Sequence, residues 1–326
     1  MKFWLYLPAN ISHKLSAFGI KLYSFFCTKK KLKYNSLTWK NLNFFNPLGI
    51  AGGVDKNAEL LKQWPKLGCG FIEVGTVTPL PQKPNSGKII DRNNKELSLW
   101  NCMGFPNKGL CHLQKQLKKH KQYPIPILIN IGKNRETDLK NAYTDYIKCM
   151  DQLQNYADIF VINISSPNTE NLRDLFLKDN LKIFLQNCLQ NKIKPTLLKI
   201  SPDLSQTELE HVLNVSCIVG VDGWVISNTT KSLNPELNFP LNKGGISGQA
   251  LEEKSKLQLR HSIEHLKKIN KRENKLIISV GGINSADKIK ERLSIGADLV
   301  QVYSALVFQG PSFFKKIYKN IKKPLL

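Results

Sequence analysis

The chain has 326 residues, of which 41% are hydrophobic and 22% charged, and this length and composition suit one large globular domain with a small extension. Lysine and arginine total 48 against 25 aspartate and glutamate, so the formal net charge is +23. Such a charge suits nucleic acid, an anionic membrane surface or an acidic substrate. The basic residues are spread along the chain, however, which favours a composition bias on solvated faces. The exception is the tight run of Lys29, Lys30, Lys31 and Lys33.

The seven cysteines are scattered and include no C-x-x-C pair. This pattern argues against a disulfide framework and a metal site, and it favours a reducing compartment. No apolar run reaches the roughly 18 residues that span a bilayer. Lys14 and Lys21 interrupt the apolar N-terminus, which is therefore unlike a signal peptide. We expect a protein of the cytosol or of the cytosolic membrane face.

The first 35 residues differ from the remainder, and we predict that they form a helical extension to a catalytic domain at residues 36–326. From Ser12 onward, apolar residues recur at helical spacing: Leu15, Phe18, Leu22, Phe25 and Phe26. An apolar face followed by a basic cluster can lie in a membrane interface. The same helix can also simply pack on the domain that follows, and the sequence leaves both interpretations open.

Eight short runs rich in Ile, Val and Leu follow, and they predict strands at residues 47–51, 71–76, 127–131, 159–164, 196–200, 223–227, 276–280 and 299–303. Amphipathic stretches between them predict helices, among them residues 139–153, 206–217, 252–269 and 285–295. Strands without polar alternation suit a parallel sheet covered by helices, and eight such units favour an α/β fold of the (β/α)₈ TIM-barrel type. Residues 79–123 show little regular pattern, and we interpret them as a functional lid over the barrel mouth.

Polar residues follow the predicted strands at their carboxyl ends, where the reactive groups of such barrels lie. Gly52 and Gly53 let a ligand approach the backbone. Asparagines or lysines stand at the ends of four other strands or just beyond them: Asn130, Asn163, Lys199 and Asn228. One asparagine is an ordinary turn former, but three in register suit a planar heterocycle whose edge alternates N–H and C=O groups.

The last two strands end in Gly281-Gly282 and Tyr303-Ser304. The corresponding loops of these barrels form a phosphate cradle from backbone N–H groups, which predicts a phosphorylated cofactor such as FMN. A nicotinamide cofactor is not indicated, because Gly68-Cys69-Gly70 is followed by Glu73 where the dinucleotide motif requires glycine.

Five segments carry a family resemblance: residues 46–56, 73–79, 130–134, 163–168 and 244–248. Together they resemble the dihydroorotate dehydrogenases, with matches in order from about residue 46 to about residue 321. The resemblance implies oxidation of dihydroorotate to orotate in pyrimidine (UMP) biosynthesis, with a hydride passing from C6 to N5 of FMN while a base takes the C5 proton.

The position of that base is occupied here by Ser166. Soluble relatives place a cysteine there, whereas the membrane-associated, quinone-reducing class uses serine. The resemblance therefore implies a membrane quinone as electron acceptor, reached through an apolar mouth formed by the N-terminal helix and lined by His13 and Arg92. It also implies a peripheral location on the cytoplasmic face of the cell membrane. A serine hydroxyl is a weak base, so it needs a shielded site and a proton relay.

The resemblance also assigns Lys56 to the orotate carboxylate and Lys199 to the pyrimidine end of the flavin. The other implied substrate positions are Asn101, Cys102, Met103, Gly104, Phe105, Asn163, Asn168, Asn228 and Thr229. The implied flavin positions are Gly52, Gly53, Val54, Asp55, Lys56, Thr76, Asn130, Asn163, Lys199, Ser227, Gly248, Gly282, Tyr303 and Ser304. Two positions depart from the family pattern. Cys102 stands where arginine is usual, which changes how that loop can be anchored, and Ser227 replaces a common threonine but keeps the hydroxyl.

Two other functions stay open at this stage. An FMN-dependent tRNA dihydrouridine synthase would suit the net charge, because phosphate neutralisation dominates RNA binding. That family carries a cysteine where Ser165 and Ser166 stand, and the chain stops at Leu326 without the RNA-binding domain expected there. A non-catalytic basic barrel that binds RNA or a membrane is the second alternative, and bound flavin would argue against it. We expect no nucleic-acid partner.

Overall fold

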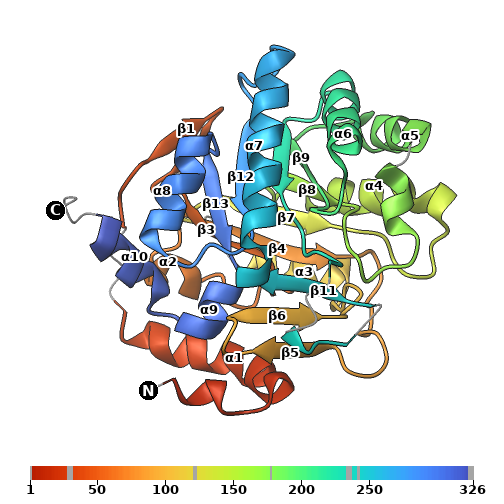
Figure 1. Ribbon diagram of the computed structural model, residues 1–326. Helices are drawn as coiled ribbons and strands as arrows, with labels where there is room; N and C mark the ends of the chain where they lie inside the picture. Colours follow the sequence, from red (N-terminus) through yellow and green to blue (C-terminus); the bar gives the residue numbers. More distant parts are fainter. Residues whose placement is uncertain are drawn as a thin grey trace.

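The computed structural model describes residues 2–27, 32–119, 123–176, 178–232, 237–240 and 243–321 (Figure 1). Its centre is a closed barrel of eight parallel strands, as the sequence predicts. In barrel order the strands are β3 (Leu48–Asp55), β4 (Phe71–Val77), β7 (Ile127–Ile131), β8 (Ile159–Asn163), β9 (Thr196–Lys199), β10 (Gly223–Ile226), β12 (Leu276–Val280) and β13 (Leu299–Val302). Each begins within one residue of its prediction. β3 extends further than predicted, with a shift of register against β4 between Ile50 and Asp55.

Helices surround the barrel and alternate with its strands (Figure 1). They are α2 (Gln63–Leu67), α4 (Ala142–Leu153), α5 (Lys178–Leu189), α6 (Gln206–Ile218), α7 (Glu252–Lys268), α8 (Ala286–Ile295), α9 (Ser304–Gln309) and α10 (Phe313–Ile321). Local signals set several of their ends. Ser205 and Glu208 form a capping box at the start of α6, and the hydroxyl of Ser285 caps α8. The four predicted helices are confirmed, the first of them opening with a 3₁₀ turn at Leu139–Asn141.

A short hairpin, β1 (Leu37–Trp39) and β2 (Leu42–Phe44), closes the amino end of the barrel. Trp39 and Phe44 pack in one cluster with Phe71 and other inward-facing residues of the barrel strands. The rings of Phe44 and Phe71 meet edge to face with centroids 5.7 Å apart. Because this end is filled with apolar side chains, ligands can enter the barrel only from the opposite end.

The lid predicted at residues 79–123 contains more regular structure than its sequence pattern indicates. β5 (Ile90–Asn93) and β6 (Ser98–Asn101) pair with β11 (Gly245–Gly248) in an antiparallel sheet, which we call the insertion sheet (Figure 1). Helix α3 (Leu110–Lys118) completes the segment. The prediction missed these strands because they are short, and one of their partners lies far away in the sequence.

The N-terminal extension forms a 3₁₀ turn at Phe3–Leu5 and helix α1 (Ala9–Phe25), which contacts α2 and β5 (Figure 1). Ala17, Ile20 and Tyr23 pack against the core. The five apolar residues singled out in the sequence instead point outward, with exposed fractions between 52% and 81%: Leu15, Phe18, Leu22, Phe25 and Phe26. No helix in the described ranges is long and apolar enough to cross a membrane. Lys29, Lys30 and Lys31 lie outside the described residues.

Candidate functional site

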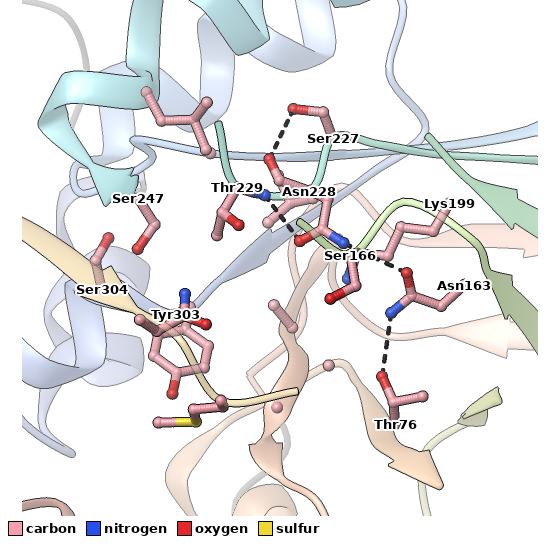
Figure 2. Close-up of a pocket in the computed structure, with 18 of the residues that line it drawn as sticks. Thr76, Asn163, Ser166, Lys199, Ser227, Asn228, Thr229, Ser247, Tyr303 and Ser304 are labelled. Carbon is pink, nitrogen blue, oxygen red and sulfur yellow. Dashed lines mark hydrogen bonds between the residues drawn. The ribbon is translucent and has the colours of Figure 1, made fainter. Parts of the chain in front are cut away.

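A cavity opens at the carboxyl ends of the barrel strands, beside the insertion sheet (Figure 2). The structure brings most of the predicted site residues together in its wall: Gly52, Gly53, Lys56, Thr76, Asn101, Met103, Gly104, Phe105, Asn163, Ser166, Asn168, Lys199, Ser227, Asn228, Thr229, Gly248, Gly282, Tyr303 and Ser304. They come from separate barrel strands and from the insertion. The closed topology therefore assembles positions that are distant in sequence.

The strand-end amides form a single hydrogen-bonded chain (Figure 2). Thr76 Oγ1 donates to Asn130 Oδ1 at 2.6 Å, and Asn163 Nδ2 donates to both of these oxygens at 3.1 and 3.2 Å. Asn228 Nδ2 in turn donates to Asn163 Oδ1 at 3.3 Å. The backbone N–H of Thr229 donates to Asn228 Oδ1 at 2.8 Å. The donor and acceptor ends of these amides are thus fixed before any ligand arrives.

A carboxylate inside the barrel terminates this chain. Glu73 is fully buried, and its Oε1 accepts from Asn130 Nδ2 at 2.6 Å and Lys199 Nζ at 3.1 Å. Its Oε2 accepts from Gln301 Nε2 at 2.6 Å, which leaves the buried Gln301 Oε1 without a partner. A side chain at Gly52, in the cavity wall, would collide with Glu73 Oε1. Glu73 therefore lies directly beneath the cavity floor and pairs with its lysine.

Ser166 lies on the loop after β8 and is only 5% exposed. Its Oγ accepts the backbone N–H of Asn168 at 3.2 Å, and a donated N–H favours the deprotonated form of a hydroxyl. Asn168 Nδ2 donates to Asn101 Oδ1 at 2.8 Å, and Asn101 Nδ2 donates to the carbonyl of Gly245 at 3.2 Å. The loop that carries Ser166 is therefore tied to the insertion sheet.

Arg173 ties three of the loops together. Its Nε donates to the carbonyl of Ser165 at 3.0 Å, its Nη2 to the carbonyl of Thr229 at 3.1 Å, and its Nη1 to Asp203 at 2.8 Å. Asp203 also accepts from Lys254 Nζ at 2.6 Å. Burial by itself would raise the pKa of Asp203, but hydrogen bonds from Lys254 and its other neighbours outweigh burial and lower this pKa to about 2.

Lys56 follows β3 in the cavity wall, and its Nζ donates to the carbonyl of Gly53 at 2.9 Å. Burial lowers the pKa of Lys56 to about 8, against a small opposing effect of Asp55. Burial likewise lowers the pKa of His13 on α1 to about 4, and the positive charge of Lys56 contributes to that shift. His13 is therefore neutral at physiological pH and lies within electrostatic reach of the predicted substrate lysine.

Several glycines in the cavity wall have positive φ angles and no room for a side chain, among them Gly248 and Gly282. Gly282 has φ +72°, and a Cβ there would collide with Glu252 at the start of α7. Gly248 has φ +90°, and a Cβ there would collide with the carbonyl of Leu97. Backbone this close to the cavity can offer its N–H groups to an anion.

Four predicted substrate or flavin residues do not line the cavity: Val54, Asp55, Cys102 and Asn130. His13 and Arg92, predicted for a quinone route, lie outside it as well. Asn130 acts from behind Thr76 and Asn163, as described above. The carboxylate of Asp55 points away from the cavity and accepts the N–H groups of Glu59, Leu60 and the Trp64 indole. Cys102 is buried in an apolar cluster with Trp100 and Ile246.

Arg92, predicted to line a quinone route, anchors the N-terminal segment. Its guanidinium donates to the carbonyls of Trp4 at 3.0 Å and Leu5 at 2.9 Å, to that of Leu7, and to Ser12 Oγ at 3.2 Å. These bonds join the start of α1 to β5 of the insertion sheet.

Several polar residues around the cavity were not predicted from the sequence. Glu73 and Gln301 each lie within a fully buried strand, between apolar neighbours. A long polar side chain in such a strand could have indicated a functional role. Arg173 and Asp203 carry no such signal, because charged residues are ordinary in loops.

The closed (β/α)₈ barrel carries its amide-lined cavity at the carboxyl ends of the strands, where enzymes of this fold place their active sites. The family model described as dihydroorotate dehydrogenase matches residues 35–325, and the chain belongs to the dihydroorotate dehydrogenase family.

Two curated relatives named dihydroorotate dehydrogenase (quinone) illustrate the match. The one from Buchnera aphidicola is 40% identical over 304 residues, covering 90% of this chain and 88% of the relative. The one from Sulfurimonas denitrificans is 39% identical over 307 residues, covering 94% and 84%. A crystal structure of the Eimeria tenella enzyme in complex with ferulenol superposes with a TM-score of 0.85 at 28% identity, covering 95% of this chain and 89% of that one.

Proposed function

We propose that this protein oxidises dihydroorotate to orotate for pyrimidine synthesis, with FMN as hydride acceptor and a membrane quinone as final electron acceptor. Ser166 carries this proposal, because it is a shielded hydroxyl in the wall of an amide-lined cavity. Curated relatives that match about nine-tenths of the chain are named for the quinone-dependent reaction.

The cavity fits FMN in two respects. Its floor holds Lys199 and the unpartnered Gln301 Oε1, which suit the polar edge of a flavin ring. Its far side holds Gly248, Gly282 and Ser304, which suit the phosphate. Bound FMN supplies the hydride acceptor. The ammonium of Lys199 offsets the negative charge that the cofactor gains on reduction.

The remaining steps belong to the side chains of this protein. Lys56 binds the substrate carboxylate and orients the ring, which lowers the entropic part of the barrier. Asn101, Asn163, Asn168 and Asn228 present amide groups to the ring edge, with orientations held by the Asn163–Asn228 and Asn101–Asn168 hydrogen bonds. Ser166 Oγ then takes the proton from C5 while its own hydroxyl proton passes to water, and the N–H donated from Asn168 favours the deprotonated oxygen.

Replacing Ser166 with alanine tests the assignment of the base. We expect flavin reduction by dihydroorotate to slow by orders of magnitude while FMN stays bound, as its visible absorbance would report. Steady-state turnover of the unmodified protein with a soluble quinone, fumarate and NAD, measured in parallel, tests the acceptor. Near-normal flavin reduction in the variant would contradict the base assignment, and turnover with fumarate or NAD alone would contradict the quinone.

We also propose that the outward face of α1 binds the cytoplasmic surface of the cell membrane peripherally. The face presents Phe18 and Phe25, which are 68% and 81% exposed, and an apolar helix face of this kind can lie at the headgroup boundary. Quinone would then reach the flavin between α1 and the barrel, near His13.

Phe18→Ser combined with Phe25→Ser tests this surface. The double variant should lose co-sedimentation with phosphatidylglycerol vesicles and slow with a membrane quinone, while the flavin half-reaction stays intact. Ile193→Ser combined with Ile218→Ser is the matched control, because these isoleucines are 71% and 75% exposed elsewhere on the molecule. Equal vesicle binding by both double variants would refute the assignment.

A further inference from the structure

We propose that Arg292, which lies outside the cavity, is a positioning residue that makes the site selective for a phosphorylated flavin over an unphosphorylated one. The inference rests on the proposed use of FMN. It concerns a side chain that neither the sequence motifs nor the cavity wall includes.

Arg292 is a buried cation with neutral partners. Its side chain, on α8, is only 1% exposed. Nη2 donates to the carbonyls of Glu252 at 2.8 Å and Gly281 at 3.2 Å and to Ser255 Oγ at 3.0 Å, and Nη1 reaches Ser279 Oγ at 3.5 Å. Nε has no partner.

No carboxylate of a described residue lies within 4 Å of the Arg292 guanidinium, and the carboxylate of the nearby Glu252 pairs with Lys288. Glu252, Glu253 and Glu291 act on Arg292 only from a greater distance. Burial lowers the pKa of Arg292 to about 10, so the group is still charged at neutral pH. A buried charge without a counter-ion is costly. This cost is offset if an anion binds close to the guanidinium.

The hydrogen bonds of Arg292 also orient the backbone toward the cavity. The carbonyl of Gly281 accepts from Arg292 and, at 2.9 Å, from Ser255 Oγ. In a trans peptide the C=O and the following N–H point in opposite directions. The N–H of Gly282 is therefore directed away from Arg292, and Gly282 lines the cavity. The same guanidinium binds the carbonyl of Glu252, so it holds the loop after β12 against the start of α7.

One buried side chain thus supplies both a positive charge with no carboxylate of a described residue in direct contact and a fixed N–H donor at the glycine-lined side of the cavity. A phosphate group would bring negative charge close to the Arg292 guanidinium. Riboflavin has the same ring system but ends in a neutral hydroxyl, so it gains nothing from the charge. The expected signature is a loss of discrimination between the two ligands, rather than a loss of flavin binding in general.

The test measures FMN and riboflavin affinities of flavin-stripped, full-length protein by fluorescence quenching, in the unmodified protein and three variants. Arg292→Gln keeps hydrogen-bond donors but removes the charge, and it should weaken FMN by at least about tenfold while leaving riboflavin nearly unchanged. Arg292→Lys keeps the charge and should retain the preference for FMN. Ser255→Ala loosens the same loop without changing charge, so it should affect both flavins alike.

Equal loss of affinity for FMN and for riboflavin in Arg292→Gln would overturn the inference, because Arg292 would then only hold the loop in place. FMN binding by the unmodified protein would still support the proposed cofactor. Unchanged FMN affinity in Arg292→Gln would overturn the inference as well. If Arg292→Gln does not fold, Arg292→Lys provides the test. Loss of the preference for FMN over riboflavin in Arg292→Lys, despite the retained charge, would overturn the inference. Failure of the unmodified protein to bind FMN would overturn both this inference and the cofactor assignment.

Discussion

Replacing Asp203 with asparagine removes the carboxylate that holds three active-site loops together. Asp203 accepts from Arg173, Lys254, the hydroxyl of Thr230 and the N–H of Lys231. Its pKa falls from the ordinary 3.8 to about 2, because these bonds outweigh the opposing effect of burial. At about 1.4 kcal/mol for each pKa unit, the difference corresponds to about 2 kcal/mol of the free energy of unfolding at neutral pH.

The sign of the pH dependence follows from the direction of that shift. A carboxylate whose pKa is lowered in the folded state stabilises the protein above its unfolded pKa, and this stabilisation is lost as the pH falls through its folded pKa. The unmodified protein should therefore exceed Asp203→Asn in stability at pH 7, and the difference should shrink between about pH 4 and pH 2. Arg173 also binds the carbonyl of Ser165, so flavin reduction by dihydroorotate should slow in the variant.

Urea unfolding of both proteins at pH 7 and pH 3 measures this difference directly. Asp91→Asn serves as the control, because Asp91 pairs with Lys88 at the surface and otherwise accepts the N–H of the adjacent Arg92, a bond that asparagine can keep. This replacement should change stability by less than about 0.5 kcal/mol. The reasoning would be refuted by a difference at pH 7 no larger than that of the control. An equal difference at both pH values would refute the electrostatic explanation.

Three further perturbations test other parts of the site. Glu73→Gln leaves Lys199 buried without its carboxylate and should lower the free energy of unfolding, measured in urea, by about 3–5 kcal/mol. The double variant Glu73→Gln with Lys199→Met should lower it by less. Equal losses in the two variants would contradict the pairing. Orotate affinity should fall as the pH rises past about 8, because Lys56 loses its charge there, and affinity that stays flat to about pH 9.5 would exclude Lys56 as the carboxylate partner. Arg92→Leu frees the carbonyls of the N-terminal turn, so limited proteolysis should cut before α1 sooner than in the unmodified protein. Unchanged cleavage would show that Arg92 does not hold that segment.

The sequence was most informative where structure is local or periodic. Strands β7 and β12 have the predicted bounds, because runs made of Ile, Val and Leu apart from Asn130 and Ser279 are buried on both faces in the barrel. Ser205 and Ser285 determine helix starts through bonds to residues three positions away, so the chain nearby is sufficient to specify them. Gly282 was identifiable because its place after a strand indicates a close approach of backbone to ligand.

Only the tertiary structure could decide which long-range partners each polar group has. Glu73 becomes a counter-ion for Lys199 because barrel closure brings β4 and β9 into reach across the interior. The insertion sheet depends on pairing β6 with β11, a pairing that no local propensity specifies.

The amphipathic pattern of α1 is equally compatible with packing and with exposure, and only the docking of the helix turns Phe18 and Phe25 outward. The sequence by itself therefore determined the barrel, its family and most of the residues at its mouth. The directions of the hydrogen bonds, the buried charges and the exposed helix face depend on contacts between distant segments, and the folded chain alone decides them.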